Sequence, residues 1–329
     1  MPMETITDFE LQRAGFYWRE IDGVRALICA PLEDDGFTNG FSTRLGGVSP
    51  MPQAALNLAG FNEDAAENIL ENRRRFLKLF GGEWTLGGCW QMHGTDVRVI
   101  RDAAKARPAE DARGDTIYCD AVVSDAEQVL AGVKTADCVP ILIGDPKTSS
   151  FAAVHAGWRG TYAGIVLYAL ERLTREYNAQ PESCRIAIGP AAAACCYEVG
   201  SEVIDGFKER FPGADDLFKP TREGHARIDL LKANRDQLLA AGVKAERIHT
   251  APLCTMSRTD LFFSYRREKL VDGKVGRLMA VIGRAGKGEK GKMGKGETGM
   301  FRPPFYPLML MGILTSRVWG GKHTSSLQL

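Results

Sequence analysis

The chain has 329 residues, a formal net charge of +1 and 44% hydrophobic residues, which is the composition of a globular protein with a sizeable core. The near-neutral charge gives no electrostatic basis for binding nucleic acid or a membrane, and no apolar run is long enough to span a bilayer. The N-terminal region contains acids and no uninterrupted apolar segment, so we expect no secretory signal and a cytoplasmic protein with reduced cysteines. We also expect a monomer.

The hydrophobic pattern alternates between helical and β-type periodicity, which predicts one mixed α/β domain. Asn62 or Asp64 can cap the first clear helix, and Asp229 can cap the last one. A helix with one apolar stripe is expected to begin near Trp158. The predicted segments, in chain order, are a helix over 65–82, strands over 96–102, 119–125, 137–145 and 150–157, a helix over 158–177, a strand over 185–190, a helix over 230–242, and strands over 246–255 and 276–283.

The sequence changes character after Arg284. The segment "AGKGEKGKMGKGETG" (285–299) is rich in glycine and lysine, and such a composition buries too little apolar surface to fold. The apolar segment "FRPPFYPLMLMGIL" (301–314) is too short and too interrupted by proline to span a membrane. We therefore predict a domain over 1–284 and a tail over 285–329 that is not part of the fold.

The two strands around "GDPKTSS" (144–150) predict a β-hairpin. With its turn centred in this segment, between residues 146 and 147, Cys138 directly faces His155. Opposed side chains share a face, with Cβ atoms roughly 4.5–5.5 Å apart, which suits two ligands of one metal or a thiol and its base. A shift of one residue would place them on opposite faces. Pro140 has no amide hydrogen to donate, so we expect an edge strand or an irregular strand there.

A second histidine, His93, stands in "CWQMHGTDVRV" just before another predicted strand. Two imidazoles and one thiolate suit zinc, and a site with three protein ligands keeps a fourth position open for water or substrate. Spacing alone leaves a second interpretation open, in which Cys138 is a small core residue and His155 a hydrogen-bonded interior histidine. No short CxxC or HExxH motif decides between them.

Nine segments of the chain stand in a recognisable order. They are "FSTRLGGVS" (41–49), "LNLA" (56–59), "ENRRRFL" (71–77), "QMHGTDV" (91–97), "TADCVPIL" (135–142), "VHAGWRGT" (154–161), "IGPAAAACCYEVG" (188–200), "DLLKANRDQLLAAGV" (229–243) and "FFSYRRE" (262–268). In this order they resemble the bacterial YfiH-like family, also called the polyphenol oxidase or laccase-domain family and described as purine nucleoside phosphorylases. The resemblance covers residues 20–283, and nine ordered matches are far more specific than one motif.

The resemblance implies a single α+β domain, a layered α/β/β/α sandwich similar to bacterial deamidating-toxin domains that use a Cys–His pair. It implies a zinc site formed by His93, Cys138 and His155. It also implies phosphorolysis of adenosine, guanosine, inosine and S-methyl-5′-thioadenosine, with adenosine deamination as a second activity, so the partners are purine nucleosides and phosphate. Family members end soon after the strand matching 276–283, so the tail over 285–329 departs from the family.

The histidine count tests the laccase name. A blue-copper centre needs two histidines and a cysteine, and a multicopper oxidase adds a cluster with further histidine ligands. This chain has five histidines in all, and one of them, His323, lies in the tail. The count excludes multicopper oxidation.

Phosphorolysis requires groups that hold a phosphate dianion beside the nucleoside. Arginine side chains and backbone amides at a helix N-terminus are natural donors to phosphate. Arg159 lies in the first turn expected after His155, and Arg44 lies in the glycine-rich "STRLGGVS" loop. We predict that these two arginines meet the anion, while packing or surface roles remain the alternative for each.

Deamination requires a carboxylate that moves protons without ligating the metal. Asp137 adjoins Cys138, but neighbours in a regular strand point to opposite faces. The irregularity expected from Pro140 is what makes Asp137 a catalytic candidate.

The main rival function is a metal-free cysteine hydrolase with Cys138 as nucleophile and His155 as base. The two functions look the same at these positions, but a dyad does not need His93, whereas zinc does. Elsewhere, the adjacent Cys195 and Cys196 can bind metal or react, but packing at a strand-to-helix junction is the simpler interpretation. The "YRR" segment over 265–267 is a candidate lining for the base pocket.

Overall fold

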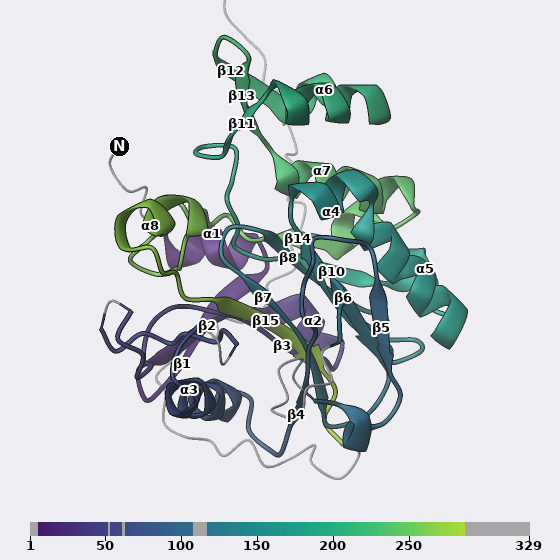
Figure 1. The fold of residues 1–329 in the computed structure, drawn as a ribbon. Coiled ribbons are helices and arrows are strands. Elements are labelled where there is room, and N and C mark those ends of the chain that lie inside the picture. Colours follow the sequence, from purple (N-terminus) through teal and green to yellow (C-terminus); the bar gives the residue numbers. More distant parts are fainter. Residues whose placement is uncertain (1–5, 52, 61–62, 108–116, 287–329) are drawn as a thin grey trace, which may run out of the picture. The chain divides into compact units, whose positions relative to one another are not determined.

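Two six-stranded sheets form the centre of the protein, and helices cover their outer faces (Figure 1). The structure is a computed structural model that describes residues 6–286 except 52, 61–62 and 108–116. The cap predicted at Asn62 and nearly all of the tail predicted over 285–329 fall outside the described residues.

The first sheet brings the start and the end of the domain together. In spatial order it contains β1 (Phe16–Ile21), β2 (Val24–Cys29), β3 (Thr38–Ser42), β15 (Leu278–Gly283), β7 (Val129–Thr135) and β4 (Thr85–Gly87). Neighbours are antiparallel except β4, which runs parallel to β7. Because β15 lies between β3 and β7, this sheet is complete only when the C-terminal strand has paired with both.

The second sheet carries the strands that the sequence singled out. In spatial order it contains β14 (Ile248–Thr250), β10 (Arg185–Ile188), β8 (Val139–Gly144), β9 (Phe151–Ala156), β6 (Ala121–Ser124) and β5 (Val97–Ile100). The four central strands are antiparallel, and each edge strand runs parallel to its neighbour. The predicted hairpin, β8 and β9, therefore lies at the centre of this sheet.

A small third sheet and the helices complete the fold. The third sheet contains β11 (Glu198–Gly200), β13 (His225–Ile228) and β12 (Phe218–Arg222). The helices are α1 (Asp8–Arg13), α2 (Ala30–Asp34), α3 (Ala66–Lys78), α4 (Trp158–Ala163), α5 (Ile165–Tyr177), α6 (Ser201–Arg210), α7 (Leu230–Ala240) and α8 (Tyr265–Asp272). The predicted cap of α7 is confirmed, because the Asp229 carboxylate accepts a hydrogen bond from the Lys232 amide.

Alternation along the strands divides the apolar core into layers. In β9, Phe151 and Ala153 pack with residues of the first sheet, whereas Ala152 and Val154 pack with α5 and α7. On the other side, α3 packs against the outer face of the first sheet. The order helix, sheet, sheet, helix confirms the predicted α/β/β/α sandwich in an α+β domain.

The helix predicted over 158–177 is in fact two helices, α4 and α5. Gly164 between them has φ +85°, a left-handed conformation that ends α4 and that glycine adopts at little cost. Ile165 and Leu173 of α5 are buried, while Tyr162 of α4 and Tyr177 of α5 are only partly buried. The apolar spacing continues across the break, so periodicity alone did not reveal it.

The predicted register of the β8–β9 hairpin is wrong by two residues. Pro140, not Cys138, lies directly opposite His155. The connection is longer than a two-residue turn, because Asp145 and Ser150 close it by backbone hydrogen bonding and Ser149 adopts φ +65°. Because side chains alternate between the two faces of a strand, a shift of two residues still leaves position 138 on the same face as His155.

Pro140 lies in a central strand, so the expectation of an edge strand is wrong. Strands β10 and β9 flank β8 on its two sides. The Pro140 carbonyl accepts a hydrogen bond from Gly189 just beyond β10, so the residue still takes part in the sheet. The alternative expectation, an irregular strand, fits the backbone just before β8, where Asp137 has φ +89°.

The described chain reaches the end of the predicted domain. Strand β15 ends at Gly283, and Arg284 forms an isolated parallel bridge with Glu127. In the part of the chain that the structure describes, no helix is both long enough and apolar enough to cross a membrane.

Gly189 is a point of close approach between the two sheets. A Cβ atom there would lie 2.3 Å from the Phe41 ring of β3 and 2.9 Å from Pro140. Gly189→Ala should therefore lower the free energy of unfolding by about 1–3 kcal/mol, as overpacking of a core does. Chemical denaturation measures this change.

The matched control is Gly206→Ala in helix α6. A Cβ atom there meets its nearest neighbour, in Tyr162, at 3.6 Å, which is ordinary contact. Alanine in a helix interior should raise stability by up to about 1 kcal/mol. Equal stability changes in the two variants would contradict the close approach of the sheets at Gly189.

Candidate metal centre

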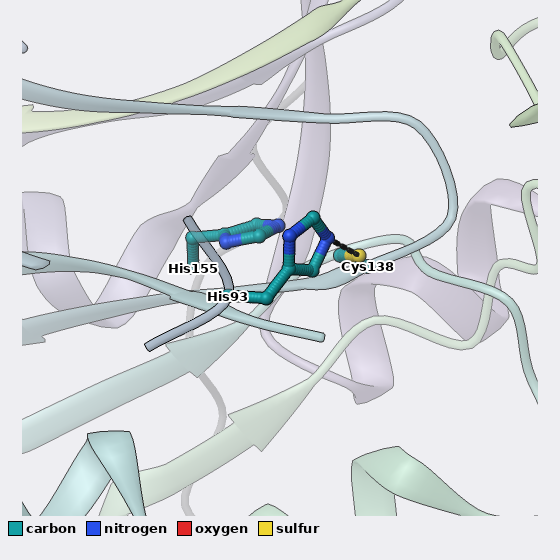
Figure 2. Close-up of side chains that lie close together, drawn as sticks. All are labelled: His93, Cys138 and His155. Carbon is teal, nitrogen blue, oxygen red and sulfur yellow. Dashed lines mark hydrogen bonds between the residues drawn. The ribbon is translucent and has the colours of Figure 1, made fainter. Parts of the chain in front are cut away.

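Three potential metal ligands, His93, Cys138 and His155, converge at one end of the second sheet (Figure 2). His155 belongs to β9, Cys138 immediately precedes β8, and His93 lies in the loop between β4 and β5. Their ligand atoms all lie within 4.8 Å of one another, and the Nε2 atom of His93 is 3.9 Å from the Cys138 sulfur. The structure thus brings together the three residues that the sequence selected.

Strand alternation explains why two of these ligands share a face. Phe151 and Ala153 of β9 point into the layer between the sheets, and His155 follows in the same phase. Leu142 of β8 points into the same layer, and Cys138 lies in phase with it four residues earlier. The ligands therefore stand at the rim of this layer, where the apolar packing ends.

The donor set and its spacing fit zinc. Zinc bonds of about 2.0–2.3 Å place tetrahedral ligand atoms roughly 3.3–3.7 Å apart, which is close to the 3.9 Å between His93 and Cys138. His155 is buried, Cys138 is half-buried and His93 is exposed. An ion held by the three would therefore keep one side toward solvent.

Because Gly157 has no side chain, His93 and Cys138 can pack directly against its backbone. A Cβ atom at this position would lie 2.8 Å from the His93 ring and 3.0 Å from the Cys138 sulfur. The "HAGWRG" turn thus needs a glycine directly after β9 because two ligands pack against its backbone.

Asp120, a residue that the sequence analysis missed, joins the ligands together. Its buried carboxylate lies 2.9 Å from Nδ1 of His155. With Nδ1 held in this way, the Nε2 atom of His155 is the one that can ligate a metal. The backbone carbonyl of Asp120 also accepts a hydrogen bond from the His155 amide, so both the backbone and the side chain of Asp120 hold His155 in place.

The same carboxylate shapes the loop that carries His93. It accepts hydrogen bonds from the amides of Met92 at 3.2 Å, His93 at 2.9 Å and Gly94 at 2.7 Å. His93 has φ +60°, an uncommon conformation for a residue with a Cβ atom, and these bonds stabilise it. Burial by itself would raise the pKa of Asp120, but His155 and the Gly94 amide lower it below its usual value.

Cys138 and His155 each stabilise the charged form of the other, the thiolate and the imidazolium. Burial opposes a thiolate, but the neighbouring His155 and His93 lower the pKa of Cys138 to about 6. Burial also opposes an imidazolium, but Cys138 and Asp120 raise the pKa of His155 to about 9. A readily formed thiolate is what a metal ligand requires, and a cysteine nucleophile requires it too.

Asp137 lies beside the cluster, with its carboxylate turned to the start of α8. It accepts hydrogen bonds from the Thr255 hydroxyl at 2.7 Å, the Ser264 hydroxyl at 3.0 Å and the Arg266 amide at 2.7 Å. Burial raises its pKa, although these hydrogen bonds act in the opposite direction. The bonds hold the backbone at φ +89° directly before Cys138.

Arg44 is engaged in contacts within the protein. Its guanidinium forms an ion pair with Glu268 at 2.7 Å, donates to the Thr259 carbonyl at 2.8 Å and stacks on Phe263. Glu268 in turn accepts the Ser264 amide at 2.7 Å. Arg44 thereby ties the glycine-rich loop to α8, the helix whose start also binds Asp137.

Arg159 differs from Arg44 in its exposure. It lies in the first turn of α4, and its guanidinium stacks on Trp158 at 4.2 Å from the ring centroid. No hydrogen bond or ion pair joins this guanidinium to another of the described residues. Its donors are therefore available to a ligand.

Tyr197 and Arg266 are further neighbours of the cluster. The Arg266 guanidinium lies 5.1 Å from the Tyr197 ring centroid, and Arg266 lies in the "YRR" segment considered for the base pocket. Burial raises the pKa of Tyr197, which Arg266 lowers and the nearby Cys138 raises. This stacked pair therefore lies within electrostatic range of the candidate ligand Cys138.

Fold and site together define a class of protein: a four-layer α+β domain with a His/Cys cluster at the rim between its two sheets. Residues 38–285 match the family described as "Multi-copper polyphenol oxidoreductase laccase". The chain belongs to this family, which confirms the family predicted from the sequence.

Relatives with assigned activities share most of the chain. The purine nucleoside phosphorylase YlmD of Geobacillus stearothermophilus is 34% identical over 262 residues, or 78% of this chain and 94% of that protein. The adenosine deaminase RL5 of an unknown prokaryotic organism is 33% identical over 267 residues, or 80% of this chain and 96% of that protein. Both names are those of enzymes that act on purine nucleosides, and they support an enzyme here.

Solved structures confirm the fold. The crystal structure of YlmD from Geobacillus stearothermophilus has a TM-score of 0.75 at 33% identity and covers 83% of this chain and 99% of its own. The Bacillus licheniformis protein YfiH has a TM-score of 0.72 at 29% identity and covers 81% and 98%.

The Asp120 contacts predict a large effect on metal binding. Asp120→Asn keeps the size of the side chain but removes the charge that orients His155 and the His93 loop. Zinc affinity, measured by competition with a chromophoric chelator, should fall about 10–100-fold. Asp125→Asn, an exposed change just beyond β6, is the control and should leave affinity unchanged. Equal affinity in the two variants would contradict a positioning role for Asp120.

Proposed function

We propose that this chain is a zinc-dependent purine nucleoside phosphorylase that acts on adenosine, guanosine, inosine and S-methyl-5′-thioadenosine and also deaminates adenosine. The observation that carries the proposal is the His93–Cys138–His155 cluster, oriented by Asp120 and exposed on one side. The names of the relatives supply the substrate class. We further propose a cytoplasmic monomer whose partners are nucleosides and phosphate, with no nucleic acid or membrane partner.

His93, Cys138 and His155 are the residues that would hold zinc. When bound, the metal supplies Lewis acidity and lowers the pKa of water toward about 7, which suits hydrolytic loss of a purine amino group. The protein's part is to keep the thiol deprotonated and both imidazoles oriented. Asp120 does this from one side, and Gly157 leaves the ligands room on the other.

Arg159 is the arginine that we propose to meet phosphate. Its exposed guanidinium lies four residues after His155 and makes no hydrogen bond within the described chain, so its fork of donors is available to a dianion. Helix α4 has only six residues, so the side chain rather than the helix terminus carries this argument.

Arg44 and Asp137 are proposed to act by positioning. Both bind the start of α8 from different sides, Arg44 through Glu268 and Asp137 through Ser264 and the Arg266 amide. Arg266 stacks on Tyr197 beside Cys138. The two residues thus place this stacked pair, which we propose lines the base pocket.

A metal-free cysteine hydrolase is the second candidate, because the pKa of Cys138 is lowered beside His155. In that function His93 would have no direct role. The position of His93, 3.9 Å from the sulfur and held in an uncommon backbone conformation, favours metal binding instead.

Removal of the metal separates the two functions. We expect the purified chain to contain one zinc and to release hypoxanthine from inosine only when phosphate is present. Chelation should abolish the activity and added zinc should restore it. Cys138→Ser should lose zinc and at least about 100-fold in rate, since loss of a direct ligand exceeds loss of an outer contact. Release of hypoxanthine by metal-stripped protein without phosphate would favour the hydrolase, and full phosphate-dependent activity after metal removal would contradict the role of zinc.

The two arginines should differ in which reaction they support. Arg159→Ala should lower phosphorolysis at least about tenfold, the equivalent of a charge-assisted hydrogen bond of about 1.5–3 kcal/mol. Deamination of adenosine, measured without phosphate, should change less. Arg44→Ala should lower both rates together and also the melting temperature, because it releases α8. A selective loss of phosphorolysis in Arg44→Ala would instead assign the phosphate to Arg44.

A further inference from the structure

A second group of sulfur atoms lies apart from the three ligands of the candidate metal centre. Cys195, Cys196 and Cys254 have sulfur atoms that all lie within 4.8 Å of one another. The sulfur atoms of Cys195 and Cys196 are 3.3 Å apart, so the side chains of this adjacent pair point toward each other. The three thiols converge without forming a disulfide.

The backbone brings these cysteines together over a long sequence separation. Ala191 and Cys254 form an isolated parallel bridge, and the turn that follows Ala191 places Cys195 and Cys196 beside Cys254. The Cys254 sulfur also accepts a hydrogen bond from the Ala193 amide at 3.4 Å. Amide hydrogen bonds to sulfur stabilise thiolates and are a common means of tuning metal–sulfur sites.

The three cysteines differ in their exposure to solvent. Cys254 is buried, Cys196 is half-buried and Cys195 is exposed. Cys195 and Cys254 line a pocket of 680 Å³. A solute can therefore reach the sulfurs from this pocket while Cys254 anchors the group to the core.

The charges around this pocket suit an anionic complex. Its lining contains one acid, Asp229, and four cationic side chains, of which Lys232 pairs with Asp236 and Arg258 pairs with Asp260. The other two, Arg13 and Arg235, form no ion pair with another described residue. A monovalent ion held by three thiolates carries a net charge of −2, which these two arginines can partly compensate.

We propose that Cys195, Cys196 and Cys254 form a second metal site that takes a soft monovalent cation, Cu(I). The donor set consists of sulfur alone: among the described residues, no histidine or carboxylate ligand atom lies within 4.8 Å of all three sulfurs. A set of three thiolates is soft and favours Cu(I), whereas the mixed imidazole and thiolate set of the first centre is of borderline softness and suits zinc. Binding displaces protons from the thiols, and no redox step is involved.

The test uses Cu(I) itself, supplied without oxygen by a chromophoric chelator, and the full chain carrying Cys138→Ser. This background removes the thiolate of the first centre. We expect one Cu(I) per chain with three sulfur neighbours by X-ray absorption. Adding Cys195→Ser, an exposed change that preserves the core, should weaken Cu(I) binding at least about tenfold.

The matched control is Cys184→Ser, another free cysteine, which lies outside the cluster. It should leave Cu(I) affinity unchanged in the same background. Equal affinities in the Cys195→Ser and Cys184→Ser chains, or a copper environment with nitrogen neighbours and fewer than three sulfurs, would overturn the proposal. Neither result depends on phosphorolysis, so this test fails or succeeds independently of the proposed function.

Discussion

The Asp120 carboxylate is the constraint on which the candidate metal centre depends. One buried group binds Nδ1 of His155 and three successive amides of the loop that carries His93. His93 holds its uncommon backbone conformation because these amides point at a negative charge. A single carboxylate therefore fixes both the orientation of His155 and the shape of the loop that carries His93, so the geometry of two ligands depends on one charged group.

A second carboxylate organises the other side of the cluster. The Asp137 carboxylate binds the start of α8, and these bonds hold the backbone of Asp137 itself at φ +89° immediately before Cys138. Arg44 reaches the same helix through Glu268. The arrangement explains how a residue next to a ligand and an arginine in a separate loop can both influence the site while their polar atoms are engaged within the protein.

The sulfur chemistry of the chain divides into two kinds of site. The first cluster combines one thiolate with two imidazoles, a set of borderline softness that suits zinc. The second consists of thiols alone and opens to a pocket with a basic lining. The family description names copper oxidation, but the five histidines of the chain are too few for a multicopper centre. Donor type, rather than the family's name, is therefore the guide to metal chemistry here.

Local sequence was sufficient to predict most strands of the second sheet and the shared face of Cys138 and His155, because alternation is a local property that survives a two-residue shift of register. His93 was selected as a second imidazole just before a predicted strand, and the family resemblance then implied the same residue. Only the tertiary structure revealed Asp120, which meets His155 across 35 residues, the pairing of Arg44 with Glu268 across 224 residues, and the approach of Cys254 to Cys195. Such contacts depend on which strands pair and how the layers pack, and these are decided by the global balance of burial against chain entropy rather than by local propensity.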